Sequence, residues 1–440
     1  MPRGLLIAAP ASGSGKTLVT LALLRRFRAT GLPVGSIKVG PDYIDPAFHR
    51  AASGRPCFNL DTWAMRPGTL AAVLARAAEG AELILGEGVM GLFDGAGPEG
   101  LGSTAALAAA TGWPVVLVVE ARGMGASAAA LVEGFLHHRP ASGPAPEIAG
   151  VIFNRTGGAG HAELLRAACA QLPVPVLGCL RRRDALVLPE RHLGLVQAGE
   201  HGDLEAFLEA ASAAVAEDLD LEALADLARP ALPASADEGP PLPPLAQRIA
   251  VARDQAFAFA YPALLEAWRA AGVELSFFSP LDDEVPDPAA EAVYLPGGYP
   301  ELHAGRLAGN RSFLEGLRAA VGRGAALYGE CGGYMVLGRV LTDAEGRDHA
   351  MAGLLPVATS FREPRLSLGY REVALLEAGP LGPAGGRFRG HEFHYARLTG
   401  GEGTRALFRG RDALGRDLGP LGCRAGPVCG SFVHLIDRAG

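Results

Sequence analysis

Lysine is almost absent from this sequence of 440 residues: of the 40 basic residues, only Lys16 and Lys38 are lysines. Ammonium and guanidinium groups differ most where a small point charge must enter a crowded set of oxygen atoms. Both lysines lie in motifs whose composition suits phosphate binding, although chance clustering in one short stretch is the alternative. Their positions are the first indication of where the chemistry takes place.

Long apolar segments and closely spaced cysteines are also lacking. No uninterrupted apolar run is long enough to span a bilayer, and the apolar start of the chain leads into a glycine-rich loop instead of a signal-peptide cleavage site. The six cysteines include no C-x-x-C pair, so we expect a reduced, cytoplasmic setting. The net charge of −7 disfavours a general nucleic-acid or anionic membrane surface.

The length of the chain predicts two domains. In the first half, short apolar runs alternate with alanine-rich stretches, which is the βαβ rhythm of a parallel sheet. A segment rich in proline, alanine and acidic residues follows, and then the rhythm restarts. We therefore predict an α/β protein with two doubly wound domains, at residues 1–225 and 248–440, joined by a linker at 226–247.

A strand, a glycine-rich turn and a helix start are predicted at residues 5–17, LLIAAPASGSGKT. Backbone N–H groups of such a turn bind phosphate, while Lys16 neutralises its outer oxygens and Thr17 ligates Mg²⁺. Pro10 stands where the usual pattern begins with glycine, which indicates a variant loop. A plain turn is the alternative to the ATP-binding residues expected here, which are Ser12, Gly13, Ser14, Gly15, Lys16 and Thr17.

Polar residues also follow two other predicted strands, in SIKVGPDYIDP and LILGEGVMGLFDG. These segments contain Lys38, Asp42, Asp45, Glu87 and Asp94. Because the carboxyl ends of parallel strands meet at one edge of a sheet, we expect Lys16, Lys38, Asp42 and Glu87 to converge. Taken singly, each acid is more typical of a loop cap than of a ligand. Oxygen ligands suit magnesium, and the candidate metal ligands are Thr17, Asp42 and Glu87.

The N-terminal half resembles the ATP domain of cobyrinic acid a,c-diamide synthases, and less closely the P-loop ligases of the dethiobiotin synthetase type. The motifs are APASGSGKT, KVGPDYIDP and EGVMGLFDG, supported by GVIFNR and LPERHLGLV. The resemblance implies that ATP phosphorylates a carboxylate and that ammonia attacks the acyl phosphate. It also implies that Asn154 contacts adenine. The residues that it implies for the substrate or acyl phosphate are Lys38, Asp42, Asp45 and Asp94.

In the C-terminal half, AALYGECGGYMVLG predicts a strand, a sharp turn at Cys331 and a helix, which is the layout of a nucleophile elbow. The helix end is expected to lower the thiol pKa. A buried structural cysteine is the alternative. His434 in GSFVHLID is the candidate base, and an oxyanion hole is predicted from Gly332 with Gly298 or Tyr299 of LPGGYPELH.

The order PGGYP, GECGG, then SxxH resembles the class I (triad) glutamine amidotransferases over residues 248–437, specifically the branch fused to corrinoid amidases. The resemblance implies that Cys331 attacks the glutamine amide and that His434 raises its nucleophilicity. Ile436 stands where many such enzymes carry glutamate, and Asp437 points to the opposite face of a strand. The third residue of the site, which would orient His434, therefore stays unassigned. The FRGHEFHY residues left without a role are His391, Glu392 and His394.

Together the halves imply ATP-dependent, glutamine-hydrolysing amidation of the a and c acetates of a corrinoid in cobalamin biosynthesis, with Mg²⁺. The residues alone indicate only amidation of a carboxylate, and they distinguish neither hydrogenobyrinate from cobyrinate nor the order of amidation. Alternatives are a nickel-sirohydrochlorin a,c-diamide synthase and cobyric acid synthase. A rival of another class is a P-loop switch ATPase with a non-catalytic C-terminal interaction domain, which predicts loss of the nucleophile. Oligomeric state is not indicated.

Overall fold

The computed structural model describes residues 2–141, 143–186, 190–191, 194–195, 197–200, 202–231, 239–401 and 403–439. The chain divides into two compact units, Met1–Trp63 with Leu70–Asp237 and Ala64–Thr69 with Glu238–Gly440. A short segment of the N-terminal half thus belongs to the second unit. Residues 232–238 of the expected linker, and much of the LPERHLGLV motif, lie outside the described residues.

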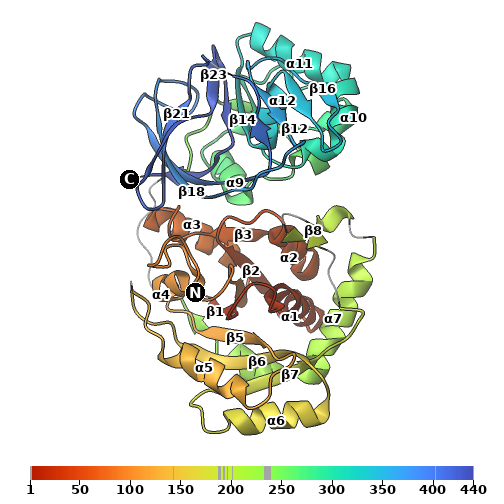
Figure 1. Cartoon of the computed structure of the whole chain (residues 1–440), viewed down its shortest axis with the longest axis vertical. Helices are drawn as coiled ribbons and strands as arrows, with labels where there is room; N and C mark the ends of the chain where they lie inside the picture. Colours follow the sequence, from red (N-terminus) through yellow and green to blue (C-terminus); the bar gives the residue numbers. More distant parts are fainter. Residues whose placement is uncertain are drawn as a thin grey trace. The chain divides into compact units, whose positions relative to one another are not determined.

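The first unit is an α/β domain built on one mainly parallel sheet (Figure 1). Its strands are β1 Arg3–Ala8, β2 Val34–Val39, β3 Cys57–Leu60, β4 Leu83–Glu87, β5 Val115–Glu120, β6 Ile148–Thr156, β7 Val176–Arg181 and β10 Arg229–Pro230, with a separate hairpin of β8 Glu190–Arg191 and β9 Gly194–Leu195. The order is β3-β2-β4-β1-β5-β6-β7, with β10 antiparallel to β1. Consecutive residues of β2 and β4 are all buried, so both faces of the sheet are covered.

Helices connect these strands, as the alternating pattern of the sequence predicts. They are α1 Lys16–Ala29, α2 Asp45–Ser53, α3 Pro67–Ala78, α4 Thr104–Thr111, α5 Ser127–His137, α6 Ala159–Cys169, α7 Leu204–Asp218 and α8 Leu221–Asp226, with the 3-10 turn η1 Ala198–Glu200. The carboxyl ends of β1, β4 and β2 lie side by side, since Ile7 pairs with Glu87 and Glu87 pairs with Lys38. This edge of the sheet positions the first candidate site.

The second unit has a central six-stranded sheet in the order β12-β11-β13-β14-β24-β23, parallel except for β23. Its strands are β11 Arg248–Ala252, β12 Glu274–Phe278, β13 Ala292–Leu295, β14 Ala326–Glu330, β23 Cys423–Ala425 and β24 Val428–Ser431. Its helices are α9 Pro262–Ala270, α10 Ala304–Gly309, α11 Arg311–Gly322 and α12 Gly332–Leu337, with the 3-10 turns η2 Gln255–Phe257, η3 Pro280–Asp282 and η4 Pro300–His303. The prediction of an α/β fold in both halves is confirmed.

Two further sheets in this unit were not predicted. One is antiparallel, in the order β22-β21-β18-β19-β25, with β18 Ser367–Leu375, β19 Arg387–His394, β21 Phe408–Asp412, β22 Asp417–Leu421 and β25 His434–Arg438. The other consists of β15 Val340–Thr342, β16 Asp348–Ala350, β17 Ala358–Ser360 and β20 Arg397–Leu398. The antiparallel sheet matters for function because its edge strand β25 begins at His434.

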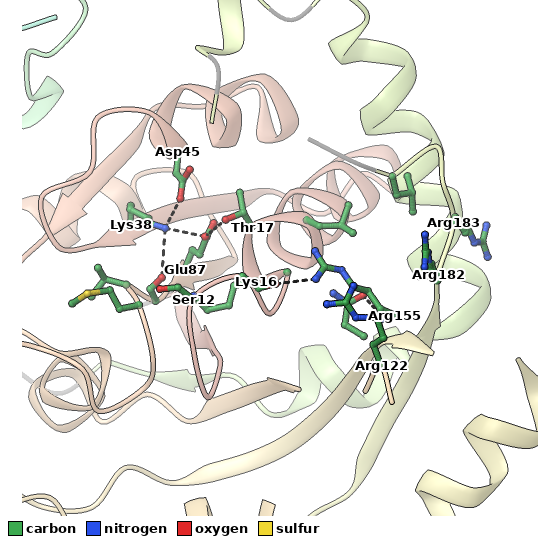
Figure 2. A pocket seen from close by; sticks show the side chains of 18 of the residues that line it. Ser12, Lys16, Thr17, Lys38, Asp45, Glu87, Arg122, Arg155, Arg182 and Arg183 are labelled. Atoms are coloured by element: carbon green, nitrogen blue, oxygen red, sulfur yellow. Dashed lines mark hydrogen bonds and ion pairs between the residues drawn. The ribbon is translucent and has the colours of Figure 1, made fainter. Parts of the chain in front are cut away.

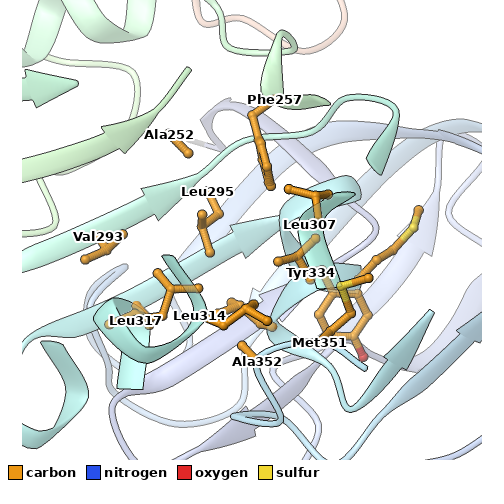
Figure 3. Packing of buried hydrophobic residues seen from close by; sticks show 14 of the residues in the cluster. Ala252, Phe257, Val293, Leu295, Leu307, Leu314, Leu317, Tyr334, Met351 and Ala352 are labelled. Atoms are coloured by element: carbon orange, nitrogen blue, oxygen red, sulfur yellow. The ribbon is translucent and has the colours of Figure 1, made fainter. Parts of the chain in front are cut away.

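Side chains of β13 alternate between two packed layers. Val293 and Leu295 belong to a buried cluster that includes Leu314 of α11 (Figure 3). Tyr294 packs instead against Trp268 of α9, with ring centroids 5.8 Å apart. The helices α9 and α11 therefore cover opposite faces of the sheet, because successive strand residues point to opposite sides. Burial of each such large side chain stabilises the fold by about 1.5–3 kcal/mol.

Among the helices in the described ranges, none combines the length and the apolar character needed to cross a membrane.

Candidate functional site

The glycine-rich loop between β1 and α1 is shaped by two glycines and braced from β6. Gly13 and Gly15 have φ angles of 79° and 88°, a conformation that other residues rarely adopt. The Asn154 side-chain amide donates a hydrogen bond of 2.9 Å to the Ser14 carbonyl. A Cβ on Gly15 would lie 2.1 Å from that amide nitrogen. Asn154 therefore supports the loop, and its contact with adenine stays a prediction.

Lys38 lies among carboxylates at the ends of β2 and β4 (Figure 2). Its Nζ lies 2.8 Å from Glu87 Oε1 and 2.5 Å from Asp45 Oδ2, with Asp42 Oδ2 at 3.8 Å. Thr17 Oγ1 donates to the same Glu87 Oε1 at 2.5 Å. The structure thus brings together the residues that we expected to meet at this edge of the sheet.

Three carboxylates surround the Lys38 ammonium, and each charge in this cluster shifts the pKa values of the others. Burial opposes the charge of Lys38, but Asp45 and Glu87 raise the pKa of its ammonium well above the usual value. Although burial favours its protonated form, Lys38 and then His49 hold the pKa of Glu87 below its usual range. Burial and Asp42 raise the pKa of Asp45 to about 7. Glu87 therefore stays ionised, and Asp45 is the carboxyl that takes up a proton near neutral pH.

His49 joins this cluster, although it was not among the predicted site residues. Its Nε2 lies 2.7 Å from Glu87 Oε2, and its Nδ1 lies 3.4 Å from the Cys57 sulfur. One oxygen of Glu87 therefore contacts Lys38 and the other contacts His49, so the carboxylate is fixed from two sides. The signal was present in the sequence, because Asp45 and His49 are four residues apart on α2 and share one helix face.

A cavity of about 590 Å³ opens beside the loop, and the Lys38 cluster forms part of its lining. Arginines also line it, namely Arg122, Arg155, Arg182 and Arg183 (Figure 2), together with Arg181. Arg155 donates a 3.1 Å hydrogen bond to the Gly13 carbonyl, which braces the loop a second time. The cavity thus joins a loop suited to phosphate, a cluster of acids and a basic lining.

Asp94 lies near the loop and shapes the turn after β4. Its Oδ2 accepts a 2.9 Å hydrogen bond from the Gly91 N–H. Burial lowers the pKa of Lys16, and Asp94 is among the acids whose charge acts in the opposite direction. Its position is that of a loop cap, and its contact with the substrate stays a prediction.

Cys331 occupies a sharp turn between β14 and α12. Its φ of 45° and ψ of −103° lie in a region that costs a residue other than glycine about 1–3 kcal/mol. A Cβ on Gly333 would lie 2.0 Å from the Leu295 carbonyl oxygen, so only glycine lets α12 approach β13 this closely. This is the strained strand-to-helix turn that the sequence predicts.

Cys331 and His434 border the same backbone position, Gly297. A Cβ there would lie 2.3 Å from His434 Cε1 and 3.3 Å from Cys331 Cβ. Both side chains are buried, with 3% and 1% of their surface exposed. The structure therefore brings the candidate nucleophile next to its candidate base, as expected.

The expectation of a lowered thiol pKa is wrong. Burial, followed by the charges of Glu301 and Glu330, raises the pKa of Cys331 well above its usual value, and the hydrogen bond from the Gly332 N–H offsets only part of this. Burial and two neighbouring histidines lower the pKa of His434 well below its usual value. Both groups are therefore neutral at rest, so the thiol must give its proton to His434 as it attacks.

The backbone amides predicted to form an oxyanion hole lie close together. A Cβ on Gly332 would lie 3.0 Å from the Gly298 nitrogen. The neighbouring Tyr299 ring packs edge-on against Phe259, with centroids 5.0 Å apart, and this contact holds the turn in place. The Gly332 N–H also points at the Cys331 sulfur. This geometry fits the prediction for the oxyanion donors.

Asp437 is engaged elsewhere and does not orient His434. Arg66 donates from its backbone N–H at 2.8 Å and from Nε at 3.0 Å to the two carboxylate oxygens of Asp437. Arg66 comes from Ala64–Thr69, the short segment that belongs to the second unit. The Asp437 side chain is completely buried by this pairing. Asp437 is therefore not available as the third residue of the site, which the sequence left unassigned.

Residues of the FRGHEFHY segment pack beside His434. The His391 ring stacks on His434 with centroids 5.0 Å apart, and the His394 ring stacks on Phe432 at 3.8 Å. Glu392 forms a 2.7 Å ion pair with Arg371. Burial and the Arg371 charge lower the pKa of His391 to about 3. A neutral imidazole therefore lies flat against the candidate base.

Two family models match the chain. Residues 248–439 match the CobB/CobQ-like glutamine amidotransferase domain, and residues 5–196 match the CobQ/CobB/MinD/ParA nucleotide binding domain. The elbow at Cys331 lies in the first match and the loop before Lys16 in the second. The chain is therefore a glutamine amidotransferase joined to a nucleotide-binding domain.

Curated relatives match over the whole length. The hydrogenobyrinate a,c-diamide synthase of Brucella anthropi is 54% identical over 440 residues, which cover 100% of this chain and 99% of that protein. Those of Rhizobium meliloti and Rhodobacter capsulatus are 53% identical, over 99% of this chain and 99% of each relative. The chain belongs to the hydrogenobyrinate a,c-diamide synthase family, whose members join nitrogen from glutamine to carbon.

Among solved structures, PurLQS from Thermotoga maritima matches 42% of this chain and 86% of its own chain, at 20% identity and a TM-score of 0.30. That similarity is too low to support a conclusion.

Proposed function

We propose that the protein amidates the a and c acetate carboxylates of hydrogenobyrinate in cobalamin biosynthesis, with ATP and with ammonia released from glutamine. The observation that carries this proposal is the presence of two different sites in one chain. One is the buried pair of Cys331 and His434, and the other is the phosphate loop beside Lys38 and Glu87. Neither site alone converts a carboxylate and glutamine into an amide. The full-length similarity to relatives of that activity supports the choice of substrate.

At the thiol site, the Cys331 sulfur attacks the amide carbon of glutamine while its proton passes to His434. The backbone N–H groups of Gly298 and Gly332 stabilise the oxygen anion that forms. When this intermediate collapses, the C–N bond breaks, and the leaving nitrogen takes the proton from His434 as ammonia. Water then hydrolyses the thioester, which gives glutamate and restores the thiol.

At the loop, a carboxylate oxygen of the substrate attacks the γ-phosphorus of ATP, and ADP leaves. Ammonia then attacks the acyl carbon of the acyl phosphate, and phosphate leaves. Lys16 neutralises the triphosphate, while Lys38, one strand away, stabilises the charge that develops on the activated carboxylate. Two such cycles convert the a and c acetates.

Magnesium fits the oxygen atoms of this site. Thr17 Oγ1 and Glu87 Oε1 lie 2.5 Å apart, and Asp42 lines the same cavity. Within the described ranges, no three His, Cys, Asp or Glu side chains form a metal-binding group, so phosphate and water oxygens would complete the shell, as is usual for Mg²⁺. When bound, Mg²⁺ would neutralise charge on the transferring phosphoryl group.

The proposed partners are glutamine, ATP and the macrocycle, without nucleic acid or membrane. We place the reaction in the cytoplasm, where glutathione keeps thiols reduced. All six cysteines lie in the described ranges and are free and buried, which is consistent with that setting.

Incubation of the protein with ATP, Mg²⁺, glutamine and one macrocycle at a time tests the proposal. The macrocycles are hydrogenobyrinate, cobyrinate and nickel sirohydrochlorin, and mass spectrometry counts each exchange of OH for NH₂. We expect two exchanges on hydrogenobyrinate, and the time course gives their order. Reaction with cobyrinate or nickel sirohydrochlorin alone would mean that the substrate is wrong, and glutamine hydrolysis without any amidation would mean that the ligase reaction is wrong. Absence of glutamine hydrolysis would favour the switch ATPase.

A further inference from the structure

Glu330, the residue directly before Cys331, is a buried carboxylate beside the candidate base. Its Oε2 lies 3.9 Å from His434 Nδ1, and each side chain is 1% exposed. This is ion-pair range but longer than a hydrogen bond. Catalytic hydrogen bonds are often long until the substrate is bound, so a modest shift of either side chain closes the contact.

Three hydrogen bonds fix the orientation of the Glu330 carboxylate. Oε1 accepts from Tyr328 OH at 2.9 Å and from the Leu435 N–H at 3.1 Å. Oε2 accepts from Tyr294 OH at 2.8 Å. A carboxylate oxygen has two lone pairs, so Oε1 is fully used, whereas among the described residues Oε2 accepts only this one hydrogen bond. The second lone pair of Oε2 is available to the Nδ1–H of His434.

The strands that hold this carboxylate also hold the reacting groups. Glu330 ends β14, which leads directly into Cys331, and Leu435 follows His434 on β25. The hydrogen bond from the Leu435 N–H to Glu330 therefore fixes the start of β25 relative to the end of β14. Any distortion at Glu330 would move the base relative to the nucleophile.

Two other acids near this site have different partners. Asp437 is paired with Arg66, and Glu392 is paired with Arg371. Glu301 also acts on the Cys331 thiol through its charge, but Glu330 is the carboxylate whose oxygen lies 3.9 Å from His434 Nδ1.

We propose that Glu330 is the positioning residue of the thiol site: it accepts the Nδ1–H of His434 and so directs Nε2 toward the Cys331 thiol. Its negative charge stabilises the imidazolium that forms when His434 takes the thiol proton. That proton later leaves with ammonia, and Glu330 does not itself take it up. The proposal rests on the glutaminase role given above to Cys331 and His434.

The titratable groups around Glu330 determine how its charge responds to pH. Facing it are Tyr294 on β13, Tyr328 on β14 and His434 on β25, and His391 on β19 stacks on the imidazole. Burial, followed by the Glu330 charge, keeps both tyrosine pKa values well above their usual range. Burial raises the pKa of Glu330 to about 7, against the three hydrogen bonds that lower it. Glutamine hydrolysis should therefore increase with pH through about 7.

Glu330→Gln tests this role because it keeps the shape of the side chain and removes its charge. We expect kcat for glutamine hydrolysis to fall by about 10²- to 10⁴-fold, with KM nearly unchanged, because the proposed role of Glu330 is exerted through His434. The rise of activity through pH 7 should disappear, and Glu330→Asp should recover part of the rate. The matched control is Tyr328→Phe, which leaves the carboxylate in place and should cost less than about tenfold.

Thermal unfolding and alkylation of Cys331 show whether each variant is folded. If Glu330→Gln is unfolded, the double variant Tyr294→Phe/Tyr328→Phe replaces it. Loss of two hydrogen bonds that lower the Glu330 pKa should then move the rise of activity to higher pH.

A Glu330→Gln enzyme with kcat within threefold of the parent, or a double variant with an unmoved pH profile, would overturn the proposal for Glu330 alone. Lack of glutaminase activity in the parent protein would instead overturn the proposed function.

Discussion

The Lys38 ammonium and the Thr17 hydroxyl donate to the same oxygen of Glu87, at 2.8 Å and 2.5 Å. Glu87 Oε1 therefore connects the helix that follows the phosphate loop with the strand that carries Lys38. Lys16 begins α1 directly after the loop, and burial lowers the pKa of its ammonium. The two lysines thus occupy different environments, and this difference is the basis for giving them different roles.

Replacement of each lysine by arginine should separate these roles. Lys38 is 4% exposed and lies between two carboxylates, so the broader guanidinium cannot take its place without displacing them. We expect Lys38→Arg to reduce amide formation by about 10²-fold with little change in ATP affinity, and Lys16→Arg to weaken ATP binding. Calorimetric titration with ATP and ammonia-driven amidation measure the two effects. An equal loss of ATP affinity in both variants would show that the two lysines have the same role.

Gly15→Ala should disrupt the phosphate loop. The added Cβ would lie 2.1 Å from the Asn154 amide nitrogen, which holds the Ser14 carbonyl, and the φ of 88° is unfavourable for alanine. We expect ATP affinity to fall at least tenfold. Gly31→Ala is the control, because its φ is 83° but no atom lies within 4 Å of the added Cβ. It should lower stability by about 1 kcal/mol and leave ATP binding unchanged. Equal ATP affinities in the two variants would show that the hydrogen bond from Asn154 to the Ser14 carbonyl is not needed to hold the loop.

Arg66→Ala should destabilise the second unit. It removes the guanidinium from a completely buried Asp437, and an unpaired buried charge costs about 3–5 kcal/mol. Thermal unfolding followed by calorimetry measures the loss. The double variant Arg66→Ala/Asp437→Asn should recover part of it, because the uncompensated charge is gone. A decrease in the free energy of unfolding of less than about 1 kcal/mol, as for a surface pair, would show that Arg66 and Asp437 do not act as a buried ion pair.

The stability of the second unit should decrease as pH falls below 6.5. His391 has a pKa of about 3 in the folded protein, against 6.5 for the free side chain. Between these values the unfolded chain binds a proton that the folded chain does not, so the free energy of unfolding falls as pH falls. His391→Gln should reduce this slope by up to about 1.4 kcal/mol per pH unit. The exposed His137 is the control for replacement by glutamine. An unchanged slope in His391→Gln would show that the imidazole is protonated in the fold.

Motifs that are continuous in the sequence were predicted well. The loop before Lys16 and the turn at Cys331 each need only a strand, glycines and a helix in succession, and both have the positive φ angles that such turns require. The α/β class followed from the alternation of strands and helices. The antiparallel sheet that carries His434 was missed, because its strand order, β22-β21-β18-β19-β25, does not follow the order of the strands along the chain.

Contacts between distant segments were not predictable in the same way. Arg66 and Asp437 are 371 positions apart, and no local pattern links them. The pKa of Cys331 was predicted in the wrong direction, because the effect of the helix end was considered without burial, which is larger. His49 could have been predicted, since its spacing from Asp45, a predicted site residue, places both on one helix face.

We propose that the thiol site releases ammonia and that the site at the phosphate loop activates the carboxylate. Cys331→Ala tests it most directly, with amidation of hydrogenobyrinate measured by mass spectrometry in the presence of ATP and either glutamine or ammonium chloride. We expect no amide with glutamine and a rate close to that of the parent enzyme with ammonia. Failure of ammonia to restore amidation in a folded Cys331→Ala protein, or continued amidation with glutamine, would contradict it.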